Sequence, residues 1–224
     1  MRQPAIATSI RIVLLACTPL LLLLSNLYLV ATPAFIRYEY DKVGFPPADV
    51  YRSEDRHALA EATVHYLRSD EGTDYLTSLS VEGRTAYNER EVKHLMDVKA
   101  VMGGAFLVQG ACVVLSLLAL FLAWRQGLWS AALRAVYESC CALIVSLAVV
   151  AFLAYFSFDL FFTAFHRIFF SGDSWLFAFS DTLIQLFPVP FWMDATWTLA
   201  LLALGECIIL GCIAYVLYRR ELAG

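Results

Sequence analysis

Four long apolar runs, separated by shorter polar segments, dominate the pattern of hydrophobic and polar positions along this chain of 224 residues. Each run is long enough to cross a hydrocarbon layer of about 30 Å as a helix. Because backbone groups in hydrocarbon must be satisfied within their own segment, helices are the structure that fits. The pattern predicts an all-α membrane protein whose four transmembrane helices lie at residues 1–33, 101–124, 136–163 and 196–218.

Arginines in the short polar segments predict the orientation of these helices. They come in pairs on one side of the predicted membrane: Arg2 and Arg11, Arg125 and Arg134, and Arg219 and Arg220. Short loops rich in Lys and Arg stay in the cytoplasm, so both termini, the turn at 125–135 and the tail at 219–224 are predicted to be cytoplasmic. The first run predicts an uncleaved signal-anchor helix, because its apolar stretch is nearly twice as long as a signal core.

The two remaining segments are then predicted to face the outside. Residues 34–100 form a small cap, with a helix expected from about Ser53 to Ser69 and one short β-hairpin around Val81-Glu82-Gly83. Asn88 and Glu91 fit a capping box that starts a helix running into the second span. Residues 164–195 form an aromatic segment with a short helix after Ser180 or Asp181, expected to lie in the interface, half in lipid.

Composition supports the membrane class and narrows the chemistry. With 60% apolar and 16% charged residues, the chain is too hydrophobic for a soluble globule. The net charge of −4 and the lack of a basic patch argue against a nucleic-acid partner. The six cysteines all fall inside apolar runs and form neither a metal-binding spacing nor an outer disulfide framework. We therefore expect no metal and no cofactor.

Two histidines are the main candidates for chemistry. His166 lies within the aromatic run Phe165–Phe170, where a titratable group is costly and suggests a function, although an interfacial aromatic belt explains the run equally well. His94 precedes Asp97 by three residues, so a carboxylate shares its helix face and can orient the imidazole; a solvated juxtamembrane turn is the competing interpretation. Asp159, two helical turns before His166, is a second candidate orienting carboxylate.

The sequence around both histidines resembles the bacterial lipoprotein intramolecular transacylase family. The resemblance rests on four runs of residues: 93–99 around His94, 165–170 around His166, Trp175-Leu176-Phe177, and 181–188. It implies a membrane enzyme of the bacterial cytoplasmic membrane, with four helices, an extracytoplasmic cap and catalytic histidines at His94 and His166. It also implies that an acyl chain moves from the sn-2 position of a diacylated lipoprotein to the amine of its own N-terminal cysteine.

The residues are compatible with that chemistry. One imidazole can take the amine proton while the other polarises the ester carbonyl and protonates the glyceryl oxygen, and the sequence does not decide which does which. Four aromatic residues are expected to shape the lipid: Phe165, Phe169, Phe170 and Trp175. Lys99 or Arg167 could hold the developing oxyanion, although snorkelling to headgroup phosphates explains both equally well.

Two other functions remain open at this point. An esterase could pair His166 with a loop serine, namely Ser171, Ser174 or Ser180. Such an enzyme would release free fatty acid, whereas a transacylase keeps both chains on its substrate. The other alternative is a non-catalytic subunit that binds lipid or a permease, with Glu206 of the fourth span at a helix contact. Glu138, one turn after Arg134, is expected to form an ion pair at the cytoplasmic boundary.

Overall fold

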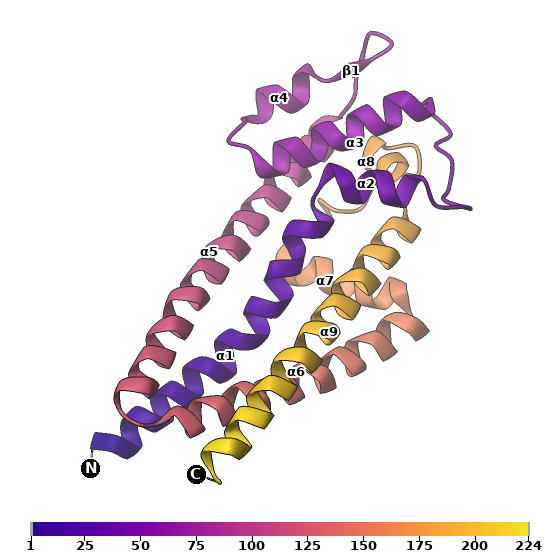
Figure 1. Ribbon diagram of the computed structural model, residues 1–224. Coiled ribbons are helices and arrows are strands. Elements are labelled where there is room, and N and C mark those ends of the chain that lie inside the picture. The colour runs from indigo at the N-terminus through magenta and orange to yellow at the C-terminus, as the bar shows by residue number, and fades with distance from the viewer. Residues whose placement is uncertain (1, 224) are drawn as a thin grey trace. The chain divides into compact units, whose positions relative to one another are not determined.

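The computed structural model describes residues 2–223, and most of them are helical (Figure 1). The helices in chain order are α1 (Arg2–Val30), α2 (Pro33–Tyr40), α3 (Ser53–Arg68), α4 (Thr73–Ser78), α5 (Glu89–Arg125), α6 (Trp129–Phe156), α7 (Phe158–Phe169), α8 (Thr182–Leu186) and α9 (Val189–Glu221). Two short strands, β1 (Ser80–Val81) and β2 (Arg84–Thr85), lie between α4 and α5. The predicted all-α class is confirmed.

Four of these helices are long and apolar enough to cross a membrane. They are the Pro4–Val30 part of α1, and α5, α6 and α9 in full. The prediction of four spans is therefore confirmed. Helix α9 begins at Val189, earlier than the predicted span, with Pro190 in its first turn, where the missing N–H of a proline costs nothing.

The third predicted span is divided. Helix α6 ends at Phe156 and α7 begins at Phe158, because Ser157 has φ −154° and ψ 84°, outside the helical region. No residue pattern indicates this break, since neither proline nor glycine is near it. As a result, His166 lies on a separate helix of 12 residues.

The described chain divides into two compact units, and each is described by itself. The first contains α1 up to Leu27, residues 105–152, and α9 from Leu199. Glu138 accepts hydrogen bonds from Arg134 Nε at 2.8 Å and from Arg11 Nη2 at 3.0 Å. The predicted ion pair is confirmed and gains a second arginine. Asn26 donates to Glu206 Oε2 at 3.0 Å, so this carboxylate has a partner on α1.

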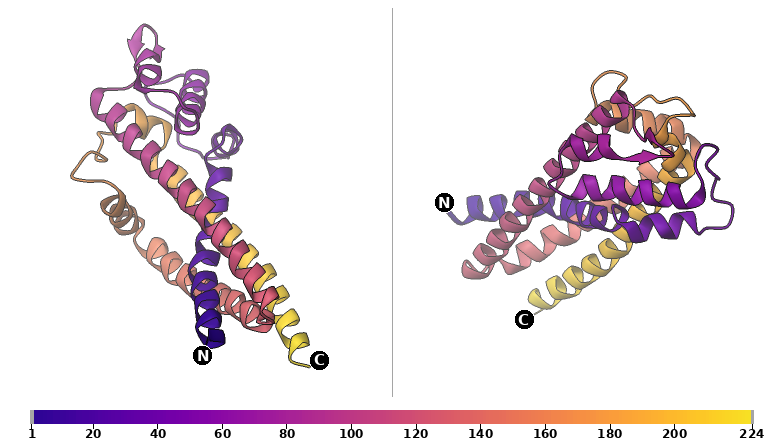
Figure 2. Two further views of the ribbon diagram at one scale, coloured as in Figure 1. Left: turned by 90° about the vertical axis from the view of Figure 1, so that its left-hand side faces the viewer. Right: turned by 90° about the horizontal axis from the view of Figure 1, so that it is seen from above.

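The second unit contains residues 28–104 and 153–198. Within it, α2 and α3 lie side by side (Figure 1 and Figure 2). Its apolar core includes side chains from α2, α3, α5 and α8 and from the start of α9, among them Ile36, Leu59, Leu95, Leu186 and Phe191. Leu183 and Phe187 are also buried in this core. The apolar side chains of α8 therefore pack against protein, a contact that the sequence did not indicate.

Local sequence signals explain the small elements of the second unit. Helix α3 confirms the expected cap helix, and Ser80 pairs with Thr85 in the expected hairpin. Glu82 and Gly83 have φ of 51° and 77°, as a two-residue type I′ turn requires. Helices α2 and α4 were not expected. Helix α2 begins with Thr32 as N-cap, whose hydroxyl accepts from Phe35 N, followed by Pro33 at its first position.

Candidate active site

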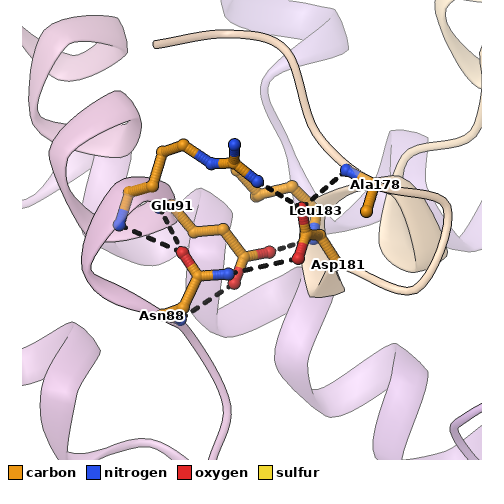
Figure 3. A network of polar contacts seen from close by, with 6 residues as sticks. Asn88, Glu91, Ala178, Asp181 and Leu183 are labelled. Carbon is orange, nitrogen blue, oxygen red and sulfur yellow. Dashed lines mark hydrogen bonds and ion pairs between the residues drawn. The ribbon is translucent and has the colours of Figure 1, made fainter.

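The N-terminus of α5 is fixed by the predicted capping box. Asn88 Oδ1 accepts hydrogen bonds from the backbone N–H groups of Arg90 and Glu91, both at 3.0 Å. Glu91 Oε2 in turn accepts from Asn88 N at 2.9 Å (Figure 3). The reciprocal bonds confirm the capping box and place His94 one turn further along the same face of the helix.

The same two side chains also bind the start of α8 and its N-cap residue. Glu91 Oε1 accepts from the backbone of Leu183 at 2.8 Å, and Glu91 is only 1% exposed. Asp181, the N-cap of α8, accepts from Asn88 Nδ2 at 3.2 Å, from Arg90 Nη2 at 2.9 Å and from its own loop (Figure 3). We call this arrangement the Glu91–Asp181 clamp. It connects the helix that carries His94 to the loop that carries Trp175 and Phe177. The sequence analysis predicted only the capping box within it.

His166 lies in the last turn of α7 and is 9% exposed. Its Nδ1 is 2.8 Å from the carbonyl oxygen of Phe162. A carbonyl oxygen only accepts hydrogen bonds, so Nδ1 carries the proton and donates it. In the neutral ring, Nε2 then has a free lone pair. Burial lowers the pKa of His166, and this outweighs the opposing effect of the bond to Phe162, so the neutral ring is favoured.

His94 is equally buried but differently held. It is 8% exposed, and within residues 2–223 its Nδ1 has no hydrogen-bond partner. Its ring contacts Phe170 and Phe177, with centroid distances of 4.9 and 5.3 Å. The protein therefore fixes the position of this imidazole by packing and leaves open which nitrogen carries the proton.

The two imidazoles lie close together in an aromatic setting. Their ring centroids are 6.3 Å apart and their planes differ by 22°. Phe170 contacts both rings, at 4.9 Å from His94 and 5.5 Å from His166. Phe162 and Trp175 contact His166 at 4.0 and 4.9 Å. Two groups that can exchange protons thus share one largely apolar site within the second unit, and Phe162 and Phe177 belong to it although sequence reasoning did not select them.

The two predicted orienting carboxylates lie differently from the expectation. Asp97 is half-buried and acts on His94 through its charge, but among the described residues no hydrogen bond joins them. Asp159 is exposed in the first turn of α7. The backbone carbonyl of Phe162, four residues before His166, holds the Nδ1 that Asp159 was expected to orient.

The predicted substrate-binding residues are also only partly gathered at the imidazoles. Phe165 is 5.6 Å from the His166 ring and contacts the tilted ring of Phe169 at 4.9 Å, and both phenyl groups remain almost half exposed. Lys99 donates to the carbonyl of Glu71 at 2.6 Å and lies 4.2 Å above the ring of Tyr66, so its ammonium is directed to the α3–α4 connection. Arg167 is exposed.

Among the described residues, neither a serine that is hydrogen-bonded to His166 nor a metal-binding cluster is found. Three loop serines were considered for an esterase: Ser171, Ser174 and Ser180. Within residues 2–223, none of them hydrogen-bonds to His166, as a serine activated by that ring would. In the same range, no group of three or more His, Cys, Asp and Glu side chains could hold a metal ion.

Comparison with known proteins gives matches over most of the chain. The sequence model of a family described as lipoprotein intramolecular transacylase Lit matches residues 12–192. A protein of Aquifex aeolicus, described only as uncharacterized, is 30% identical over 174 residues, which are 75% of this chain and 76% of that protein.

Solved structures match as well. The membrane integral lipoprotein intramolecular transacylase Lit of Bacillus cereus superposes with a TM-score of 0.73 at 19% identity, covering 99% of this chain and 98% of that one. A variant of the same protein with one histidine replaced by alanine superposes with a TM-score of 0.72 at 17% identity, covering 99% and 96%. At these identities the likeness shows a shared fold.

Proposed function

Because this chain belongs to the lipoprotein intramolecular transacylase family, we propose that His94 and His166 together transfer an acyl chain within a diacylated lipoprotein. The acyl chain leaves the sn-2 oxygen of the diacylglyceryl group and is received by the amine of the N-terminal cysteine. The product is a lyso-form lipoprotein with one N-linked chain. The observation that carries this proposal is the pair of buried imidazoles, 6.3 Å apart, between aromatic side chains.

His166 is the base in this proposal. Its Nδ1 is committed to Phe162, so the Nε2 lone pair is available to take a proton from the attacking amine. A C–N bond then forms as the ester carbonyl carbon becomes tetrahedral. The Phe162 carbonyl, which accepts the hydrogen bond from Nδ1, stabilises the positive charge that develops on the His166 ring. The proton taken by His166 leaves with the glyceryl oxygen when the C–O bond breaks, so the enzyme ends in its starting state.

His94 is the electrophilic partner. An N–H of its ring donates to the ester carbonyl oxygen and stabilises the oxyanion that forms there. This stabilisation is largest in a site that contains little water. Burial and the nearby His166 lower the pKa of His94, so its ring is neutral, and the charge of Asp97 opposes this shift only weakly and without a hydrogen bond to the ring. Phe170 and Phe177 pack against the same ring and limit its rotation.

The aromatic side chains account for transfer to an amine instead of to water. Donor and acceptor belong to one substrate molecule, so no acyl-enzyme is needed and the reaction gains from proximity, by up to roughly 7 to 11 kcal/mol in favourable cases. Phe162, Phe170 and Trp175 surround the imidazoles and restrict the approach of water. The paired arginines at the ends of the spans support a site at the extracytoplasmic face, with both termini in the cytoplasm.

The test uses the purified full-length protein and a synthetic lipopeptide with a diacylglyceryl cysteine and a free amine. Mass analysis of the product should show an unchanged total mass, with one acyl chain now in fragments that contain the nitrogen. Release of free fatty acid would support the esterase instead. If the protein is folded and no chain moves, the proposal fails.

A further inference from the structure

A polar cleft of about 660 Å³ lies in the second unit, between the first turns of α5 and the loop after α7. It is lined by Glu89, Arg90, Lys93, Ser171, Asp173 and Ser174. Its volume lies within the range of about 300 to 1,000 Å³ that is usual for ligand sites in proteins. The reaction proposed above assigns no task to these residues.

The cleft adjoins the two-histidine site. Lys93 directly precedes His94, and Ser171 directly follows Phe170, which contacts both imidazoles. The guanidinium of Arg90 lies 5.3 Å from the ring centroid of Phe177, which also contacts the ring of His94. The cleft therefore lies beside Phe177, an aromatic side chain of the two-histidine site.

The lining offers hydrogen-bond donors and acceptors in similar numbers. Arg90 is paired with Asp181. Within residues 2–223, Lys93, Glu89 and Asp173 form no ion pair, and all three are exposed. A site for an anionic headgroup would be lined by cations and donors. An extended peptide presents both N–H and C=O groups, and it fits this mixture better.

The substrate has one polar part that the aromatic side chains cannot receive. Its acyl chains are apolar, but the polypeptide that follows the lipidated cysteine would lose its hydrogen bonds between phenyl rings. We propose that the polar cleft binds the first two or three residues after that cysteine, which span about 3.3 to 3.6 Å each when extended. This inference rests on the proposed function and adds to it a subsite for the peptide of the substrate.

The experiment compares lipopeptides that differ only in the charge of the second and third residues, both Asp or both Lys. For each enzyme, the measured quantity is the ratio of kcat/KM for the acidic peptide to that for the basic one, which cancels any loss of folded protein. Lys93→Glu should lower this ratio about fivefold and Asp173→Lys should raise it by a similar factor, both less at high salt. The matched controls are Arg84→Glu and Asp70→Lys, exposed charges outside the cleft, which should leave the ratio unchanged.

A third substrate, diacylglyceryl cysteine amide without a peptide, separates the two proposals. If the wild-type protein converts none of the substrates, the proposed function fails. If it converts all of them and the ratio does not respond to Lys93→Glu or Asp173→Lys, the peptide subsite is wrong while the function stands. Finally, turnover can be measured in vesicles with and without anionic lipid. If anionic lipid changes the turnover of the wild-type protein and Lys93→Glu alters that change while the kcat/KM ratio stays constant, the cleft binds lipid headgroups and the inference is overturned.

Discussion

The two histidines are buried to the same extent but are held by different means. His166 is fixed by a hydrogen bond from Nδ1 to a backbone carbonyl of its own helix. His94 has no such bond among the described residues and is held by the rings of Phe170 and Phe177 and by the anchoring of α5 at Glu91. A backbone carbonyl decides which nitrogen is protonated, whereas packing decides only where the ring lies. The contrast suggests a base with one fixed tautomer opposite a partner that can adapt to the substrate.

Removal of either ring tests this division most strongly. His166→Ala and His94→Ala should each lower the turnover of the lipopeptide by about 10²- to 10⁴-fold, the usual contribution of a positioned acid or base. Mass analysis of acyl migration measures the loss. His65→Ala is the control, since that histidine is exposed and contacts Tyr75. Normal turnover in His166→Ala would remove the base from the mechanism.

The anchoring of His94 is tested at the Glu91–Asp181 clamp. Glu91→Ala leaves the N–H groups of Asn88 and Leu183 without their acceptor, so the free energy of unfolding should fall by about 2 to 4 kcal/mol. Glu91→Gln keeps one acceptor oxygen and should cost less. Thermal unfolding of the full chain in detergent ranks the stabilities of these variants. Glu89→Ala, at an exposed position, is the control. Equal unfolding temperatures for all three variants would show that the clamp does not stabilise the second unit.

The fixed tautomer of His166 predicts a particular pH dependence. The free substrate amine titrates near pH 8, so log kcat/KM should rise with pH with a slope of about one below that value. Below the pKa of His166, protonation of this base raises the slope of log kcat/KM against pH from about one to about two. Because burial lowers this pKa, the second break should lie below the ordinary value of about 6.5.

The same profile identifies the cause of the shift. Trp175 contacts His166 at 4.9 Å, and Trp175→Ala admits water to the ring, so the break should move up toward pH 6.5. The exposed Phe179→Ala should leave it in place. A break above pH 6.5 in the wild-type protein would contradict the assignment of a buried neutral base.

The smallest effect is expected at the carboxylates. Asp97 acts on His94 through its charge without a hydrogen bond, so Asp97→Asn should lower turnover only about threefold. Asp159→Asn, with an exposed side chain in the first turn of α7, should change nothing. A loss of 100-fold in Asp97→Asn would mean that the carboxylate bonds to His94 during the reaction and would make the two histidines alike.

Features that depend on neighbours in sequence were predictable. The apolar runs predicted the four spans, and the order of Asn88 and Glu91 predicted the start of α5. The turn at Glu82 and Gly83 predicted the hairpin. Each of these signals is local, because hydropathy, capping and turn geometry act within a few residues.

Features that depend on distant or backbone partners were not predictable. The atom that holds His166 is a carbonyl, which every residue possesses, so the sequence pointed to Asp159 instead. The second partner of Glu91 is Leu183 N, 92 positions later, and nothing near Glu91 indicates it. The break at Ser157 lies in an apolar run without proline or glycine, so the sequence predicted one continuous span.

The Glu91–Asp181 clamp also determines how much of the chain must be synthesised before the two-histidine site can form. Helix α8 has five residues, too few to be stable alone, and its first turn relies on a carboxylate made 92 positions earlier. A nascent chain that ends before Leu183 already contains both histidines but lacks the contact that joins their surroundings. We therefore expect the enzyme to stay inactive on the ribosome until its second outer segment has emerged.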